Sequence, residues 1–320
     1  MSFVEADYGA SEGAALVEVL LVGLTNAKLV CKSTVEEDEG KTIVVTDGVT
    51  AVTGKFNSNL TATFDLAGKA AYKVTVSNAG VTEFETIVHL SAGEYKEIEV
   101  GLNTNTWTGL KNIVNAHLET TYCNIGDEIN VTLNTKEVMT YRIAAINHDQ
   151  PHQLIFEPRH CMETARQMNP SNTNAGGWNA CTMREWLNGV FYQALPDELK
   201  AVISERTFKT SIGNQGSALQ EATDKIWLPK EWEVFGTQTY ATATEHTSDT
   251  AQFPIYAVAS NRVKTYGKSG GSAYWWLSSP YSGNATAFCS VTTAGAAYNG
   301  CGASDSYGVA PCFQIVSSES

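Results

Sequence analysis

Histidine and cysteine are the residue types in this chain best suited to metal binding or nucleophilic chemistry. His148, His152 and His160 lie close together in the sequence, but their spacing matches no standard zinc pattern. The seven cysteines are Cys31, Cys123, Cys161, Cys181, Cys289, Cys301 and Cys312. They are odd in number and include no Cys-x-x-Cys pair, which argues against a disulfide framework. We therefore expect no metal and no cofactor, and we interpret the cysteines as small buried side chains in a reducing compartment.

The sequence contains no recognisable catalytic arrangement, such as a Ser/His/Asp set or paired carboxylates. Calcium-dependent sugar binding through Glu-Pro-Asn or Gln-Pro-Asp is not expected either. The nearest triplet is Glu157-Pro158-Arg159, and arginine is no calcium ligand. Arg184 and Trp186 could form a binding pair, but their helical context favours an inward-packed tryptophan and an arginine bonded to loop carbonyls. We expect a protein that is not an enzyme.

The segment 277–313 has the most distinctive composition. It contains no Lys, Glu, Gln, Met or Trp, although these five types supply 58 of the first 276 residues. At that rate the segment would hold about eight of them. Tyr281, Tyr298 and Tyr307 stand instead among Ser, Gly, Ala and Asn, a composition typical of antibody paratopes. The alternative interpretation is a loop of low complexity.

Within this segment we predict a binding face. Core changes cost about 2–5 kcal/mol of a total stability of about 5–15 kcal/mol, so side chains that vary must be exposed. The period-two series Ser290, Thr292, Ala294 and Ala296 predicts one side of a strand or hairpin, with Cys289, Val291 and Thr293 on the other. The predicted ligand-binding residues are Tyr281, Asn284, Ala287, Ser290, Thr292, Ala294, Ala296, Tyr298, Asn299, Gly300, Cys301, Gly302, Ser304, Asp305 and Tyr307.

The first hundred residues predict an all-β domain. Runs rich in Val, Thr and Ile recur between turn signals such as Asp47-Gly48. The predicted strands are Leu16–Leu24, Ala27–Ser33, Lys41–Thr46, Asn59–Leu66, Ala71–Ser77, Glu83–Leu90 and Lys96–Val100. Strands of this number and spacing favour an immunoglobulin-like β-sandwich over residues 1–102.

The composition changes near Gly101, and the rest of the chain predicts an α+β domain over 103–320. The predicted helices are Trp107–Leu118, one that begins near Cys181 with Thr182 and Glu185 as a capping box, and Pro196–Ser204. The second helix has an apolar stripe of Trp186, Leu187, Val190 and Phe191. The predicted strands are Glu128–Leu133, Met139–Asn147 and Gln153–Glu157.

Four motifs follow one another in this half. They are GGWNACTMREWLN at 176–188, IWLP at 226–229 with Glu233, YWWLSSP at 274–280 and GVAPCF at 308–313. In this order they resemble a bacterial and phage domain family with the C-type-lectin fold, related to the formylglycine-generating-enzyme type. The resemblance covers about 104–320 and implies a C-type-lectin-like domain. Ser278 stands where the family usually has arginine, which puts any salt bridge of that arginine in doubt.

Many members of that family are variable proteins of diversity-generating retroelements, in which a reverse transcriptase miscopies template adenines into the 3′ end of the gene. Mutated AAC and AAT codons still end in C or T and cannot encode Lys, Glu, Gln, Met, Trp or a stop. The composition of 277–313 agrees with this expectation. Because Cys289, Cys301 and Cys312 lie in the region where the related enzymes carry active-site cysteines, an enzyme of that type is the alternative from another class.

Charge and hydropathy limit the partners. The net charge is −13 and the pI about 4.9, so nucleic acid is not expected as a partner. Membrane insertion is not expected, since the longest apolar run, Ala14–Leu24, is interrupted by Glu18. The N-terminus lacks the layout of a signal peptide, which favours cytoplasmic synthesis and display on a virion. We expect a phage tail protein that binds a host-surface protein or glycan, with the N-terminal domain contacting other virion proteins; a bacterial cell-surface adhesin is the alternative.

Overall fold

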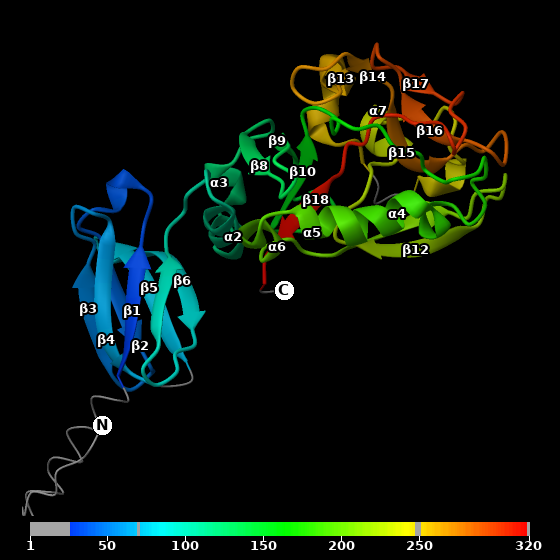
Figure 1. The fold of residues 1–320 in the computed structure, drawn as a ribbon. Coiled ribbons are helices and arrows are strands. Elements are labelled where there is room, and N and C mark those ends of the chain that lie inside the picture. The colour runs from blue at the N-terminus through cyan, green and yellow to red at the C-terminus, as the bar shows by residue number, and fades with distance from the viewer. Residues whose placement is uncertain (1–25, 69–70, 247–250, 319–320) are drawn as a thin grey trace, which may run out of the picture. The chain divides into compact units, whose positions relative to one another are not determined.

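The computed structural model describes residues 26–68, 71–246 and 251–318. The chain divides into two compact units, Met1–Asn103 and Thr104–Ser320 (Figure 1). Both units are built mainly on β-sheet, and their helices are few and short. The β-rich character expected from the sequence is confirmed.

Two sheets, in which most neighbouring strands are antiparallel, form the first unit. Its strands are β1 (Asn26–Lys32), β2 (Thr42–Thr46), β3 (Ala51–Lys55), β4 (Thr61–Ala67), β5 (Tyr72–Asn78), β6 (Val81–Val88) and β7 (Tyr95–Glu99), with a short 3-10 helix, η1 (Glu36–Asp38). One sheet has the order β4-β1-β7, in which β1 and β7 are parallel, and the other has the order β3-β2-β5-β6. The two sheets share one hydrophobic core.

The alternation of apolar and polar residues explains these strands. In β5, Tyr72, Val74 and Val76 are buried while the residues between them are exposed or half-buried. The sequence missed β3, since this strand is largely exposed and shows no alternation to detect. The predicted strand Leu16–Leu24 lies outside the described residues.

The second unit has a central antiparallel sheet of order β18-β10-β9-β8. Its strands are β8 (Glu128–Thr132), β9 (Val138–Ile146), β10 (Gln153–Pro158) and β18 (Phe313–Val316). Helix α2 (Trp107–Asn115) packs against this sheet, with Trp107 edge-on to Phe156 and Phe313 at 5.5 and 5.6 Å between ring centroids. The first helix of the unit, α2, therefore packs against its last strand, β18.

A buried ionic cluster ties this sheet to Tyr256 and to Lys264 of strand β13 (Lys264–Thr265). Glu157 on β10 is fully buried and accepts from Arg142 on β9, from Tyr256 and from Lys264. Lys264 is also fully buried and donates to the carbonyl of Pro158. A buried charge is tolerated only when it is paired in this way.

The remaining helices are short. They are α3 (Glu119–Tyr122), α4 (Thr182–Trp186), the π-helical turn η3 (Leu187–Phe191), α5 (Tyr192–Ala194), α6 (Asp197–Lys200) and α7 (Glu231–Phe235). The 3-10 turns are η2 (Trp178–Ala180), η4 (Ala243–Glu245), η5 (Pro254–Ala257) and η6 (Ala259–Arg262). None of the helices in the described part of the chain combines the length and apolar character needed to cross a bilayer.

The structure corrects two details of the predicted helix near Cys181. Cys181 is the cap, because its Sγ accepts from the backbone N–H of Arg184, whereas Thr182 already lies inside α4. Val190 does not belong to the apolar stripe, because it is 65% exposed. The π-helical turn shifts the register of the helix at this point, so a strict 3.6-residue period fails there.

Smaller sheets carry the C-terminal loops. Their strands are β11 (Arg206–Ser211), β12 (Leu219–Asp224), β13, β14 (Ser272–Ala273), β15 (Trp275–Pro280), β16 (Phe288–Val291) and β17 (Ala297–Tyr298). Strands β15, β16 and β17 form one antiparallel sheet with β16 in the middle, drawn in orange tones in Figure 1.

Candidate functional site

The candidate site is the set of three loops that leave the β15-β16-β17 sheet, at 281–287, 292–296 and 299–307. Two fully buried tryptophans fix this sheet. Trp275 donates its Nε1–H to the carbonyl of Arg262 at 2.9 Å, and Trp276 donates to the carbonyl of Arg166 at 2.8 Å. These bonds hold the base from which the loops project.

Asn174 holds the first loop through main-chain atoms. This side chain is fully buried, and its Nδ2 lies 3.2, 3.0 and 2.7 Å from the carbonyl oxygens of Tyr281, Asn284 and Ala287. Its Oδ1 accepts from the backbone N–H of Asn214 at 2.8 Å. Because the bonds reach carbonyl groups, they do not depend on the side chains of Tyr281, Asn284 and Ala287.

Main-chain bonds also hold the third loop. Asn169 donates its backbone N–H to the carbonyl of Ala303, and Ala303 donates to the carbonyl of Thr286 at 2.8 Å. Asn172 Oδ1 accepts from the backbone N–H and the hydroxyl of Ser304. The first and third loops therefore lie side by side, joined through main-chain groups.

For three of the predicted ligand-binding residues, the prediction that they are accessible to a ligand is wrong. Ala287, Ser290 and Cys301 are 3%, 0% and 0% exposed, so they cannot contact a ligand at the surface. Ser290 Oγ lies 3.1 Å from Cys301 Sγ in the interior. Ser290 is buried because β16 is the middle strand of its sheet and is covered along its whole length; Ala287 directly precedes this strand, and Cys301 lies against Ser290.

The predicted period-two strand face is also wrong beyond Val291. There β16 ends, and a tight turn follows in which Thr292 donates its backbone N–H to the carbonyl of Ala296. Gly295 makes this turn possible with a φ of 80°, in the left-handed region that glycine favours. The residues after Val291 therefore belong to a turn, and the two-residue period has no meaning for them.

Four further predicted residues use their side chains to shape the loops. Asn284 Oδ1 accepts from the backbone N–H groups of Thr286 and Ala287, and Asp305 Oδ2 accepts from that of Gly302. The other two of the four are Thr292, which accepts from Ala296, and Ser304, which donates to Asn172.

Five predicted residues are exposed or half-exposed and have no side-chain hydrogen bond within the described structure. They are Tyr281, Ala294, Ala296, Tyr298 and Asn299, and we call them the variable face. Gly300 and Gly302 adjoin them; a side chain at Gly302 would approach Asn172 Oδ1 to 2.5 Å.

The tyrosines of these loops rest on other aromatic rings. Tyr298 and Tyr307 lie against Tyr274 at 5.4 and 5.6 Å between centroids, and Tyr307 also lies edge-on to Trp276 at 5.0 Å. Tyr281 is edge-on to Tyr240 at 5.9 Å. Such rings are held in place before a ligand arrives, which lowers the entropic cost of binding.

The cysteines lie in the interior of the protein. All seven are free and buried, as predicted. Burial raises the pKa of Cys161 and Cys181 to about 12, and it raises the pKa of Cys289 and Cys312 well above the usual range. A cysteine acts as a nucleophile in its thiolate form, which a raised pKa disfavours.

The three histidines have separate surroundings. His148 lies 4.9 Å from the ring of Phe253, His152 stacks on His117 at 3.4 Å, and His160 contacts the hydroxyl of Thr265. Across residues 26–68, 71–246 and 251–318, no three His, Cys, Asp or Glu side chains converge as a metal site would require.

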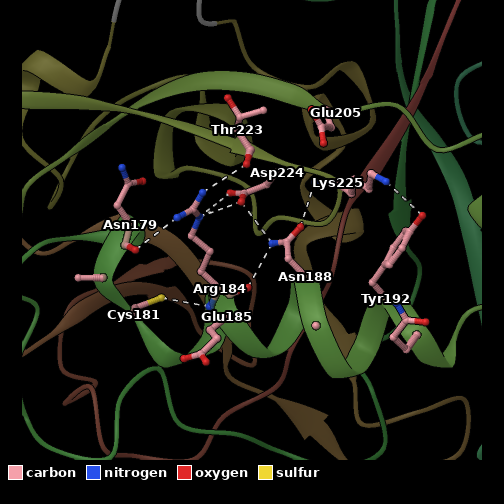
Figure 2. Close-up of a pocket in the computed structure, with 13 residues that line it drawn as sticks. Asn179, Cys181, Arg184, Glu185, Asn188, Tyr192, Glu205, Thr223, Asp224 and Lys225 are labelled. Carbon is pink, nitrogen blue, oxygen red and sulfur yellow. Dashed lines mark hydrogen bonds and ion pairs between the residues drawn. The ribbon is translucent and has the colours of Figure 1, made fainter.

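A separate open pocket of about 780 Å³ lies along α4, η3 and β12 (Figure 2). Arg184 bonds Asp224 through Nε at 2.8 Å and donates to the carbonyls of Asn179 and Thr223. Trp178 donates its Nε1–H to Asp224 at 2.7 Å. Burial raises the pKa of Asp224, and the bonds from Trp178 and Arg184 oppose that rise.

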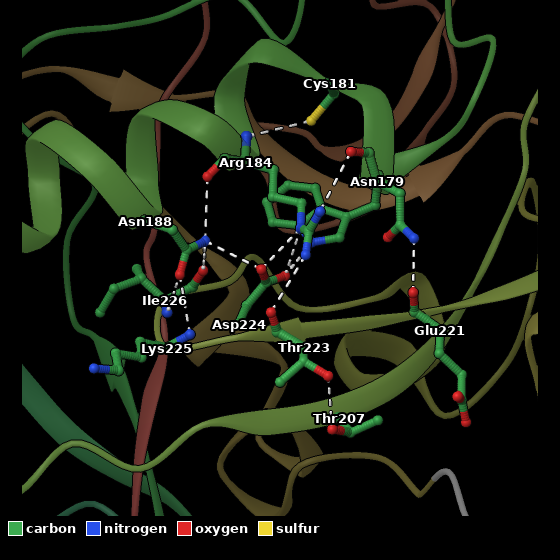
Figure 3. Close-up of polar contacts among 11 residues, drawn as sticks. Asn179, Cys181, Arg184, Asn188, Thr207, Glu221, Thr223, Asp224, Lys225 and Ile226 are labelled. Carbon is green, nitrogen blue, oxygen red and sulfur yellow. Dashed lines mark hydrogen bonds and ion pairs between the residues drawn. The ribbon is translucent and has the colours of Figure 1, made fainter.

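Asn188 completes this network (Figure 3). Its Nδ2 donates to the carbonyls of Arg184 and Ile226, and its Oδ1 accepts from the backbone N–H groups of Lys225 and Ile226. The central polar groups of the pocket are therefore bonded to one another. We interpret them as a clamp between helix and strand, in which Arg184 bonds a carboxylate and the carbonyls of η2 and β12, whereas loop carbonyls were expected.

Residues 135–317 match a family model described as a domain of unknown function, DUF6273. The match covers more than half of the chain. The chain belongs to the DUF6273 family. The matched region of this DUF6273 protein contains the loops at 281–287, 292–296 and 299–307, the tryptophans beneath them and Asn174.

Known proteins offer little more to compare. No curated protein matches. A Bacteroides uniformis protein named as a candidate carbohydrate binding protein matches 37% of this DUF6273 protein and 51% of its own chain, at 13% identity and a TM-score of 0.18. The TIE protein of Bacillus anthracis matches 42% of this chain and 28% of its own, at 11% identity and a TM-score of 0.20. The DUF6273 chain thus spans about half or less of these structures.

Sequence reasoning missed the residues that hold the loops. Asn174 stands in an ordinary polar stretch, and its role depends on contacts more than a hundred residues away. Arg166 was missed as well, although Trp186, which it covers at 3.8 Å, was singled out. Trp186 is half-buried under this arginine, so the expectation that it packs inward holds only in part.

Proposed function

We propose that the DUF6273 unit is a non-catalytic ligand-binding domain whose specificity is set by the side chains of the variable face. The observation that carries this proposal is the main-chain anchoring of the loop 281–287 by Asn174, a fully buried residue from outside the variable segment. Anchors that bond carbonyl oxygens do not depend on the side chains of the loop. The ligand-contacting residues can then change without loss of the fold.

Two further observations support the proposal. The loops are rich in Tyr, Ser, Gly and Asn, which suit adaptable recognition surfaces. The absence of Lys, Glu, Gln, Met and Trp from 277–313 agrees with diversification through codons ending in C or T. We accordingly propose a variable protein of a diversity-generating retroelement, with a C-type-lectin-like second unit and an immunoglobulin-like first unit.

The proposed setting is a phage tail. In this setting the variable face binds a host-surface protein or glycan, and the first unit attaches the protein to other virion components. Display on a bacterial cell surface is the alternative, and the variable face would serve either. A template repeat and a reverse transcriptase gene beside this gene would support diversification; tail genes nearby would favour the virion.

Selection for binding tests the proposal. Tyr281, Ala294, Ala296, Tyr298 and Asn299 are randomised together with codons ending in C or T, and the displayed full chain is selected on immobilised hen lysozyme and, separately, on immobilised serum albumin. We expect clones that bind one of these proteins and not the other. A matched library at five exposed positions of the first unit serves as the control. If the variable-face library yields no more specific clones than the control, the proposed function is wrong.

A further inference from the structure

Arg166 differs from the other arginines of the chain. Arg142, Arg159, Arg184 and Arg206 each pair with a carboxylate. The sixth, Arg262, donates to the carbonyl of Tyr256. Within the described structure, the guanidinium of Arg166 has no hydrogen-bond acceptor and no carboxylate partner, and its Nε is enclosed without one.

The guanidinium of Arg166 is nevertheless held in one place. It lies 3.8 Å above the ring of Trp186, a cation–π contact. The backbone of Arg166 exchanges two hydrogen bonds with Tyr307, and its carbonyl accepts from Trp276. An arginine that is fixed in position but lacks an acceptor is preorganised for an anion, because its planar fork binds a carboxylate with two parallel bonds.

Two hollows adjoin the stacked pair, and their charges differ. Glu137 and Glu163 line the hollow of about 420 Å³, and their negative charges would repel an anionic ligand there. The hollow of about 340 Å³ has no acidic residue in its lining, although the protein carries a net charge of −13. An anion on Arg166 would therefore occupy the smaller hollow.

The other groups around the smaller hollow indicate the kind of ligand. Thr182 and Ser306 offer hydroxyl groups, Gln167 an amide, and Trp186 an aromatic surface. The single positive charge of Arg166 suits a ligand with a single negative charge. The hydroxyl and amide groups of the protein suit a ligand ring that carries hydroxyl groups. Ser306 lies within 277–313, so the hollow is next to the loop at 299–307.

We propose that Arg166 and Trp186 form a fixed subsite for the carboxylate of an acidic sugar, a uronate residue of a glycan. The carboxylate accepts two hydrogen bonds from Arg166, and the sugar hydroxyls bond Thr182 and Ser306. This inference rests on the proposed ligand-binding function and names a ligand class for it. The subsite supplies a constant contact, and the variable face beside it supplies selectivity among glycans that carry the acid.

Titration of the full chain with D-glucuronate, D-glucose and N-acetylaspartate amide, followed calorimetrically and by ligand-observed NMR, tests the subsite. We expect D-glucuronate to bind about ten-fold or more tightly than D-glucose, since hydrogen bonds to a charged group are the stronger ones. It should also bind more tightly than N-acetylaspartate amide, which has the carboxylate but no ring hydroxyls for Thr182 and Ser306. Arg166→Gln should abolish the preference, and Arg166→Lys should reduce it. The control Arg159→Gln removes an equal charge from an exposed pair with Glu128 and should leave the affinity unchanged.

Ser306→Glu keeps the test valid if the Arg166 variants fail to fold. Ser306 is exposed, so the variant should fold, and its new carboxylate should weaken D-glucuronate binding about ten-fold by repulsion. Equal affinity for D-glucose and D-glucuronate, or no effect of Arg166→Gln and Ser306→Glu, would overturn the subsite. Equal or tighter binding of N-acetylaspartate amide would overturn the sugar and assign an acidic peptide instead. If these titrations contradict the subsite but the lysozyme and albumin selections yield specific clones, the proposed ligand-binding function still stands.

Discussion

Replacement of Asn174 by alanine tests how the loops are held. The substitution removes the donor to the carbonyls of Tyr281, Asn284 and Ala287 and the acceptor for the N–H of Asn214. Ala287 keeps a second bond, from the backbone N–H of Tyr281. Of the four main-chain groups that lose this partner, three keep no other hydrogen bond within the described residues, and at roughly 1 kcal/mol each the free energy of unfolding should fall by about 3 kcal/mol.

Urea unfolding at neutral pH measures this loss, and amide hydrogen exchange locates it. We expect faster exchange in the loop 281–287 and at Asn214, with the central sheet β18-β10-β9-β8 unchanged. Asn299→Ala is the matched control, because Asn299 is a half-buried asparagine of the same region with no side-chain hydrogen bond in the described structure; it should cost less than about 0.5 kcal/mol. If the two variants unfold at the same urea concentration, Asn174 does not anchor the loop 281–287.

Two further predictions concern the framework. Lys264→Met removes one partner of the buried Glu157, so the free energy of unfolding measured in urea should fall by about 3 kcal/mol. The control Lys200→Met breaks a pair in which Asp197 is 99% exposed and should cost less than about 1 kcal/mol. Equal losses in the two variants would contradict the stabilising role of the buried cluster. Burial lowers the pKa of His148, so as pH falls through about 6.5 the unfolded chain takes up its proton before the folded chain does, and stability decreases toward acid. His148→Gln should show a shallower loss of stability between pH 7.5 and 5.5, and an unchanged slope would refute this cause.

Local patterns in the sequence predicted β1, β2 and the strands from β4 to β10. In β5 the alternation of Tyr72, Val74 and Val76 with polar residues reports directly which side faces the core. The exposed strand β3 carries no such pattern and was missed. The helix at Trp107 was predicted because its apolar spacing matches the face that packs on Phe156 and Phe313.

The C-terminal segment shows where local patterns stop being informative. Composition singled out the segment 277–313, but it could not separate Ser290, buried in the middle strand of a sheet, from Ala294, exposed in a turn. That difference depends on β15 and β17 lying on either side of β16. Asn174 and Arg166 could not be found from the sequence for the same reason, because their partners are distant along the chain.

Paired substitution libraries test the central claim most directly. One library places codons ending in C or T at Tyr281, Ala294, Ala296, Tyr298 and Asn299, and the other places the same codons at five buried positions of the segment. These are Leu277, Ala287, Ser290, Cys301 and Ala303. The fraction of clones that resist protease at 37 °C is measured for each. We predict that most clones of the first library and few of the second remain folded; similar fractions in both would contradict the account.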